Sequence, residues 1–99
     1  MKDLLIHINK AFESKARLGI MSALMVNDKL DFNALKELLD LTDGNLASHL
    51  KALEEQSYVA VQKQFVGRKP NTTYLATAEG RKAFQEHLSA LEKLISGNR

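Results

Sequence analysis

The stretch TDGNLASHLKALEEQSYV, residues 42–59, indicates one amphipathic helix that runs directly into a β-strand. Leu46, Leu50 and Leu53 are spaced four and three residues apart, so they form one apolar stripe along a helix. The stretch opens with small or polar residues, which is unusual for a helix that only fills a core. We therefore expect the leucines to hold this helix, residues 42–57, while its opposite side contacts a partner.

The sequence on either side of this stretch predicts four more helices and a β-hairpin. In residues 58–66, apolar and polar side chains alternate, which indicates a strand. GRKPN, residues 67–71, is expected to be the turn that leads into a return strand, residues 72–76. The other helices are predicted at residues 2–9, 14–27, 32–39 and 77–96, with a short extended piece at 29–32. The fold class is therefore mostly α with a small β-hairpin (α+β).

Length, charge and composition favour a single domain that spans residues 1–99. The chain has 99 residues, a formal net charge of +2 and no cysteine. The lack of cysteine excludes disulfides, thiolate metal sites and cysteine nucleophiles. The mildly basic balance is compatible with a polyanionic partner without requiring one. Because the sequence has no long apolar run and no recognisable signal peptide, we expect a cytoplasmic protein without a membrane partner.

The order of these elements, together with two stretches of sequence, resembles the winged helix-turn-helix transcription regulators. The first stretch is DFNALKELLDLTDGNLASHLKALEEQSYV, residues 31–59, and the second is YLATAEGRKAF, residues 74–84, with the Tyr-x-x-Thr-x-x-Gly pattern that follows the wing in that family. The chain is similar to small MarR-like and ArsR-like repressors and to short single-domain winged-helix proteins. The resemblance covers roughly residues 18–91. It implies a winged helix-turn-helix core flanked by N- and C-terminal helices.

The outer side of helix 42–57 carries residues suited to the DNA major groove. Small side chains allow close approach, and Thr42, Asn45 and Ser48 offer hydrogen-bonding groups for base edges or phosphates. Asp43 is expected either to repel a phosphate or to accept a hydrogen bond from a cytosine amino group. The alternative is that Thr42 and Asp43 only cap the helix and the other residues face water. The candidate DNA-binding residues of this helix are Thr42, Asp43, Gly44, Asn45, Ala47, Ser48 and Lys51.

The hairpin is the second candidate contact, because its charge has a single sign. No acidic residue lies between Glu55 and Glu79. This composition favours contact with the DNA backbone or minor groove, and the alternative is an ordinary solvated turn. Lys15 and Arg17 are further candidates for phosphate contacts, although we favour an ordinary surface role for both. The candidate DNA-binding residues of the hairpin are Lys63, Arg68, Lys69, Asn71 and Thr72.

The first and last helices carry apolar stripes that favour a homodimer. In helix 77–96 the apolar residues follow spacings of four, three and four, a heptad-like seam. A two-fold dimer would present two copies of helix 42–57 to a palindromic site. The alternative is that both helices, residues 1–12 and 77–96, only pack on their own domain. The candidate dimer residues are Leu4, Leu5, Ile8, Phe84, Leu88, Leu91 and Ile95.

The sequence therefore predicts a dimeric, sequence-specific repressor that reads double-stranded DNA with helix 42–57 and contacts it with the wing, residues 63–72. The alternative is a winged-helix module that binds other proteins. We see no catalytic set and no cofactor motif, so an enzyme is not expected. His7 and His87 alone do not make a metal site, and we expect His49 to be structural, with a phosphate contact as the alternative. Nothing in the sequence identifies an effector, although a small molecule acting between the terminal helices and the core is compatible with it.

Overall fold

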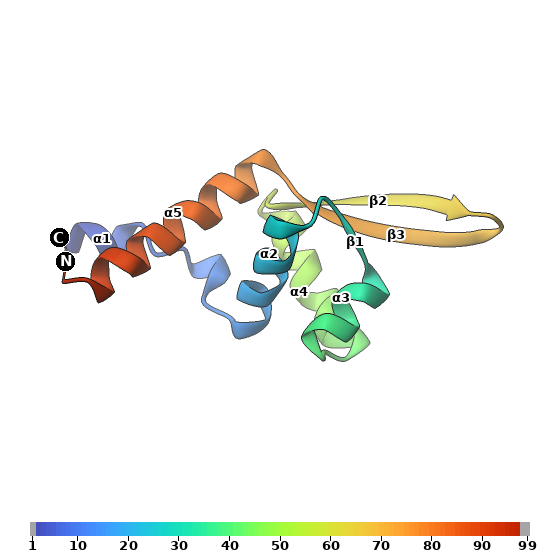
Figure 1. Ribbon diagram of the computed structural model, residues 1–99, viewed down its shortest axis with the longest axis horizontal. Coiled ribbons are helices and arrows are strands. Elements are labelled where there is room, and N and C mark those ends of the chain that lie inside the picture. The colour runs from blue at the N-terminus through green and yellow to red at the C-terminus, as the bar shows by residue number, and fades with distance from the viewer. Residues whose placement is uncertain (1, 98–99) are drawn as a thin grey trace.

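The computed structural model describes residues 2–97 as an elongated molecule of 54 × 25 × 21 Å (Figure 1). Residue 1 and residues 98–99, the ends of the predicted domain, lie outside the described residues. The hairpin extends at one end of the molecule, and α1 lies beside the C-terminal half of α5 at the other end (Figure 1). The elements in chain order are α1 (Lys2–Ile6), the 3-10 helix η1 (Lys10–Phe12), α2 (Lys15–Val26), β1 (Leu30–Asp31), α3 (Phe32–Leu39), α4 (Asp43–Glu55), β2 (Val59–Val66), β3 (Lys69–Ala76) and α5 (Ala78–Ile95).

Three central helices, α2, α3 and α4, begin at residues whose side chains satisfy free backbone amides. The side chains of Ser14, Asp31 and Thr42 accept hydrogen bonds from the backbone three residues ahead. Between α3 and α4, Asp40 adopts a left-handed conformation with φ of 52°, which ends α3. These local signals explain why the predicted boundaries of the three helices are confirmed to within two residues.

The prediction for the N-terminal helix is only partly correct. Residues 2–9 were expected to be one helix, but α1 ends at Ile6 and a separate 3-10 helix follows. Asn9 is extended, and its side chain accepts a hydrogen bond from the backbone N–H of Ala11 at 2.9 Å. The backbone N–H of Asn9 donates to Nδ1 of His87 on α5, also at 2.9 Å. Ile8 therefore lies in a connection outside α1 and does not share a helical face with Leu4 and Leu5.

The sheet is antiparallel with strand order β1-β3-β2. The register pairs Val66 with Lys69, so the turn contains only Gly67 and Arg68 rather than the five residues expected. Gly67 has φ of +67° while Arg68 does not have a positive φ, as in turns of type II′. Pro70 is part of β3, beyond the part of that strand that pairs with β1. Its missing N–H therefore leaves no gap in the β1–β3 ladder.

The hydrophobic core lies between α2, α4, the base of the hairpin and the start of α5. Phe12 is at its centre, with ring centroids 5.2 Å from those of both Tyr58 and Phe84. Phe84 is only 2% exposed, which contradicts its prediction as a dimer contact, because its side chain is already enclosed by its own domain. The buried apolar residues are Phe12, Ile20, Met21, Ala23, Leu24, Leu35, Leu46, Leu50, Leu53, Val59, Ala76, Phe84 and Ala90.

The predicted fold class is confirmed: a mostly helical molecule with a three-stranded antiparallel sheet, in the order expected for a winged helix. From here on, the wing means β2, β3 and their turn, and the terminal arm means α1 with the C-terminal half of α5. Among residues 2–97, none of the helices has the length and apolar content needed to cross a membrane.

Candidate nucleic-acid interface

Helix α4 has one side fixed in the core and the other open. Leu46, Leu50 and Leu53 are 0%, 1% and 0% exposed, as their spacing predicts. The structure places all seven candidate residues of this helix, from Thr42 to Lys51, in the exposed class. Gly44 is so open that a Cβ built there would have no atom within 4 Å. A partner can therefore approach the N-terminal half of α4 closely.

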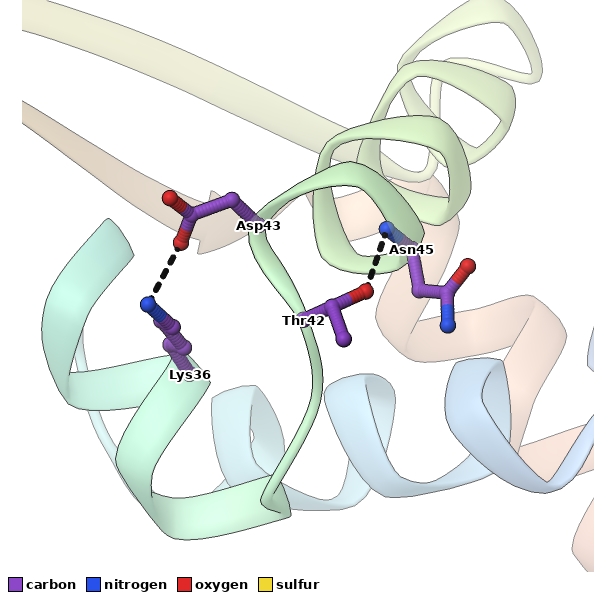
Figure 2. Close-up of polar contacts among 4 residues, drawn as sticks. All are labelled: Lys36, Thr42, Asp43 and Asn45. Carbon is purple, nitrogen blue, oxygen red and sulfur yellow. Dashed lines mark hydrogen bonds and ion pairs between the residues drawn. The ribbon is translucent and has the colours of Figure 1, made fainter.

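The N-terminus of α4 is capped by Thr42. The Oγ1 atom of Thr42 accepts a hydrogen bond from the backbone N–H of Asn45 at 3.2 Å (Figure 2). Thr42 therefore caps α4, and its contact with DNA stays a prediction. The side chain of Asn45 extends away from this bond (Figure 2). Asn45 and Ser48 remain as the candidates for base contacts in the first two turns.

Asp43 forms an ion pair that the sequence analysis did not anticipate. Its carboxylate lies 2.8 Å from Nζ of Lys36 on α3 (Figure 2). The side chains are 42% (Lys36) and 72% (Asp43) exposed, so water screens the pair and its contribution to stability is small. The pair nevertheless holds a cation beside the single carboxylate in the first turn of α4. No local spacing rule joins residues on two different helices, which is why sequence reasoning missed Lys36.

Arg17 and His49 connect α2 to α4. Nε of Arg17 donates a hydrogen bond to Nδ1 of His49 at 3.1 Å. His49 is half-buried, with one ring nitrogen satisfied, as in the structural role expected for it. Lys15, Asn45 and His49 line one groove of about 790 Å³ at the junction of α2, α3 and α4. The structure therefore brings the exposed Lys15 to the same region of the surface as the N-terminal half of α4.

Glu54 lies away from the open side of α4. It is half-buried and close to Tyr74 of β3, and burial, together with the Glu54 carboxylate, raises the pKa of the Tyr74 hydroxyl. Helix α4 contains three acidic residues, Asp43, Glu54 and Glu55, and one lysine, Lys51. Of these, Asp43 is paired with Lys36 and Glu54 faces the sheet. The open N-terminal half of α4 is therefore less acidic than its composition indicates.

The candidate residues of the wing differ in their exposure to solvent. Lys63, Arg68 and Lys69 are exposed, and the register places Lys63 opposite Thr72. Asn71 and Thr72 are half-buried rather than displayed at the tip. Both line a cleft of about 370 Å³ beside the start of α3, together with Asp31, Phe32, Asn33, Pro70 and Tyr74. The Oδ1 atom of Asn71 is buried there without a hydrogen-bond partner in the described part of the chain.

The two histidines at the terminal arm do not form a joint site. His87 is 3% exposed and accepts from the Asn9 backbone, whereas His7 is exposed. Burial lowers the pKa of His87 below its ordinary value of 6.5, an effect that the nearby Glu13 opposes. Within residues 2–97, no three His, Asp or Glu side chains come together as metal ligands would.

This geometry agrees with the chain's similarity to known proteins. The sequence profile of the family described as "Winged helix DNA-binding domain" matches residues 16–95. The chain belongs to this family. An uncharacterized protein from Methanocaldococcus jannaschii is 39% identical over 85 residues, which cover 86% of this chain and 92% of that protein.

Solved structures of transcriptional regulators match the fold along nearly the whole chain. A transcriptional regulator homologue from Pyrococcus horikoshii OT3 is 33% identical, with a TM-score of 0.88, and the match covers 98% of this chain and 97% of that chain. A MarR-family regulator from Enterococcus faecalis V583 is 25% identical, with a TM-score of 0.68 and coverage of 97% and 82%. The predicted resemblance to MarR-like winged-helix regulators is therefore confirmed, and this winged-helix protein is a DNA-binding domain of the regulator type.

Proposed function

We propose that this winged-helix protein is a cytoplasmic, dimeric, sequence-specific repressor of transcription that blocks a promoter by binding double-stranded DNA. The observation that carries the proposal is the two-sided α4, which has three fully buried leucines on one side and an open N-terminal half on the other. A helix held in this way can enter the major groove without any rearrangement of the core.

In this proposal the two open turns of α4 read the DNA. Asn45 and Ser48 contact base edges, while Gly44 and Ala47 let the helix approach the groove closely. Lys51 neutralises a phosphate. Asp43 accepts from a cytosine amino group or is held off the phosphates by Lys36.

The wing supplies the second contact. Its exposed cations, Lys63, Arg68 and Lys69, lie in a segment without acidic residues, so they contact phosphates or the adjacent minor groove. Asn71 and Thr72 contribute neutral donors from the cleft beside α3.

The terminal arm supports the proposal of a dimer. Leu5, Leu88 and Ile95, on the two helices of the terminal arm, are 57%, 42% and 86% exposed, and apolar surface of this kind suits a contact with a second copy of the chain. Leu4, Ile8 and Leu91 are half-buried beside them. We propose that two arms pack through a two-fold axis, so that one domain serves both dimerisation and DNA binding. Phe84 lies in the core, where it packs on Phe12 and anchors α5 to the rest of the domain.

An effector, in this proposal, would bind beside the dimer contact. A groove of about 360 Å³ lies between α1 and α5, lined by Leu4, His7, Lys82, Gln85, Glu86, Ser89, Ala90 and Lys93. Occupation of this groove would alter how the two arms pack and hence the spacing of the two α4 helices.

The test begins with purified protein incubated with sheared DNA from its source organism, followed by sequencing of the retained fragments. We expect one enriched palindromic sequence, with an affinity that falls steeply as salt rises. Arg68→Ala should reduce the salt slope by about 1, and Ser48→Ala should weaken binding to the selected site more than binding to unrelated DNA.

Two matched variants serve as controls for this experiment. Ser22→Ala removes an exposed serine from α2, and Lys10→Ala removes an exposed cation from η1, outside the wing, α4 and the terminal arm. Both should bind like the wild type. If no fragment is enriched and the weak binding is the same at every salt concentration, the protein-interaction alternative replaces the proposal.

A further inference from the structure

The wing exposes an apolar pair close to its tip. Phe65 of β2 is 73% exposed, although a phenylalanine is among the side chains most often enclosed in a core. Its direct cross-strand partner is Pro70 of β3, which is also exposed. Directly paired residues in an antiparallel ladder lie on the same face of the sheet, so the two rings form one apolar surface.

The register shows which side of the wing carries this pair. Side chains alternate along a strand, so Phe65 lies on the same face as Val61 and Val59. At the base of the wing this face is buried in the core through the pair Val59 and Ala76. Tyr74, which pairs with Val61, lies near Glu54 of α4. The apolar pair therefore lies on the side of the sheet that packs on α4.

The surroundings of the pair are cationic. Arg68 lies in the turn and Lys69 directly follows it. Lys63 lies two residues before Phe65, on the same face of the sheet as Phe65. Residues 56–78 contain no acidic side chain. An apolar surface with cations beside it and no acidic side chain on its own two strands complements a polyanion that also offers apolar groups. The deoxyribose walls and base steps of a DNA minor groove fit this description.

We propose that Phe65, backed by Pro70, makes an apolar contact in the minor groove, while Arg68 and Lys69 bind the phosphates on either side. This inference rests on the proposed function and deepens it, because it assigns to the wing a contact that does not depend on charge. Phe65 lies six residue steps along the strand from Val59, so the pair stands about 20 Å beyond the core, far enough to lie in a groove next to the one that α4 enters. An apolar side chain placed between or against base steps also bends the duplex.

The experiment compares the wild type with Phe65→Ala, Val66→Ala and Arg68→Ala. Each protein is titrated by fluorescence anisotropy against the selected duplex at several salt concentrations. Val66 is the matched control, because it is 60% exposed on the neighbouring position of the same strand but lies on the opposite face. All three side chains are exposed, so we expect the variants to fold, and their melting temperatures check this.

Phe65→Ala should weaken binding roughly tenfold or more at every salt concentration, with an unchanged salt slope, because apolar burial does not involve counterion release. Val66→Ala should bind within about twofold of the wild type, and Arg68→Ala should show a loss that shrinks as salt rises. A dye pair at the two duplex ends should report a smaller bend with Phe65→Ala than with the wild type.

Three outcomes overturn the inference while leaving the proposed function intact: wild-type affinity for Phe65→Ala, equal losses for Phe65→Ala and Val66→Ala, or a changed salt slope for Phe65→Ala. A fall in the dimer population of Phe65→Ala, measured by sedimentation, would assign the pair to a second copy of the chain and also overturn it. If the wild type itself selects no DNA, the proposed function fails and the inference fails with it.

Discussion

Gly80 lies where the first turn of α5 meets the backbone of Tyr58. A Cβ at this position would be only 2.1 Å from the carbonyl oxygen of Tyr58, which is an impossible contact. Three residues earlier, the hydroxyl of Thr77 donates to the carbonyl of Ser57 and accepts from the N–H of Gly80. The Tyr-x-x-Thr-x-x-Gly pattern of the sequence therefore has a packing reason, because both of its last two residues fix α5 against the end of α4.

We expect Gly80→Ala to destabilise the fold by about 1–3 kcal/mol or more, because the added methyl group forces α5 away from Tyr58. Urea unfolding followed by circular dichroism measures the change. Gly44→Ala is the control, since nothing lies within 4 Å of a Cβ there and alanine favours a helix. Equal stability of Gly80→Ala and the wild type would show that α5 does not pack as described.

His87 makes the stability of the terminal arm depend on pH. Its Nδ1 can accept the Asn9 N–H only while that nitrogen carries no proton, and burial keeps the pKa of His87 below 6.5. As pH falls below about 6.5, the histidine of the unfolded chain takes up a proton before the folded one does, so the unfolded state becomes favoured. The contribution of neutral His87 to the free energy of unfolding is therefore complete above about pH 6.5, and it is lost as the pH falls towards the lowered pKa of His87.

We expect the free energy of unfolding of the wild type to fall more between pH 7.5 and pH 5.5 than that of His87→Gln, which cannot titrate at this position. Urea titrations at both pH values give the two differences, and their comparison removes the contribution of all other groups. A difference between the proteins that is the same at both pH values would refute the role of His87.

At the scale of elements, α3 and α4 are joined at their polar side by Lys36 and Asp43. We expect Lys36→Ala to change stability by less than about 1 kcal/mol, since the pair is exposed. The same variant should lower the affinity for the selected DNA several-fold at low salt, because the Asp43 carboxylate then faces the phosphates alone. Anisotropy titrations at two salt concentrations measure this loss, which should shrink as salt rises.

The double variant Lys36→Ala, Asp43→Asn is the control for this element. It removes the unpaired carboxylate and should recover most of the lost affinity. If the double variant binds as weakly as Lys36→Ala, then Lys36 contacts DNA itself and does not act through Asp43.

The elements were predictable to the extent that local chemistry determines them. Ser14, Asp31, Thr42 and Thr77 mark helix starts because their side chains cap amides within the same few residues. The end of α1 was missed because a contact between residues 78 positions apart, Asn9 with His87, replaces the helix there. The short turn was missed because the strand register, rather than composition, limits it to Gly67 and Arg68.

The candidate site, too, was predictable where local spacing determines it and not where contacts between distant residues do. The open side of α4 was predictable from the spacing of its leucines. A heptad-like spacing, by contrast, cannot distinguish the side of a helix that packs on its own domain from the side that packs on a partner. For this reason Phe84 was assigned to the dimer although it lies in the core. The Lys36–Asp43 pair likewise could not be predicted from the sequence, because it depends on how α3 and α4 pack against each other.

At the scale of the whole molecule, the two ends have separate chemistry: cations on the wing and aliphatic side chains on the terminal arm. We expect Leu88→Glu to convert the proposed dimer to monomer, because it places a charge within that aliphatic surface. Sedimentation measures the mass, and DNA affinity should fall with it, since a monomer contacts only one half-site.

Val26→Glu is the matched control, because Val26 is 82% exposed at the end of α2, away from the arm. It should leave both mass and DNA affinity unchanged. A Leu88→Glu protein that keeps the mass of the wild type would contradict the proposed interface.

The joint between α4 and α5 has a mechanical consequence. Ser57 and Tyr58, which directly follow α4 and its C-cap, are held to the start of α5 by hydrogen bonds of 2.6 and 3.1 Å from Thr77 and by the tight seat of Gly80. Because these contacts couple α5 rigidly to α4, a tilt of the arm rotates α4 and the wing with it. Over a length of 54 Å, a tilt of one degree moves the far end by about 1 Å. A rotation of a few degrees therefore moves the far end by about the rise of one base pair, about 3.4 Å, so a small change in the tilt of the arm is enough to bring the molecule into or out of register with its DNA.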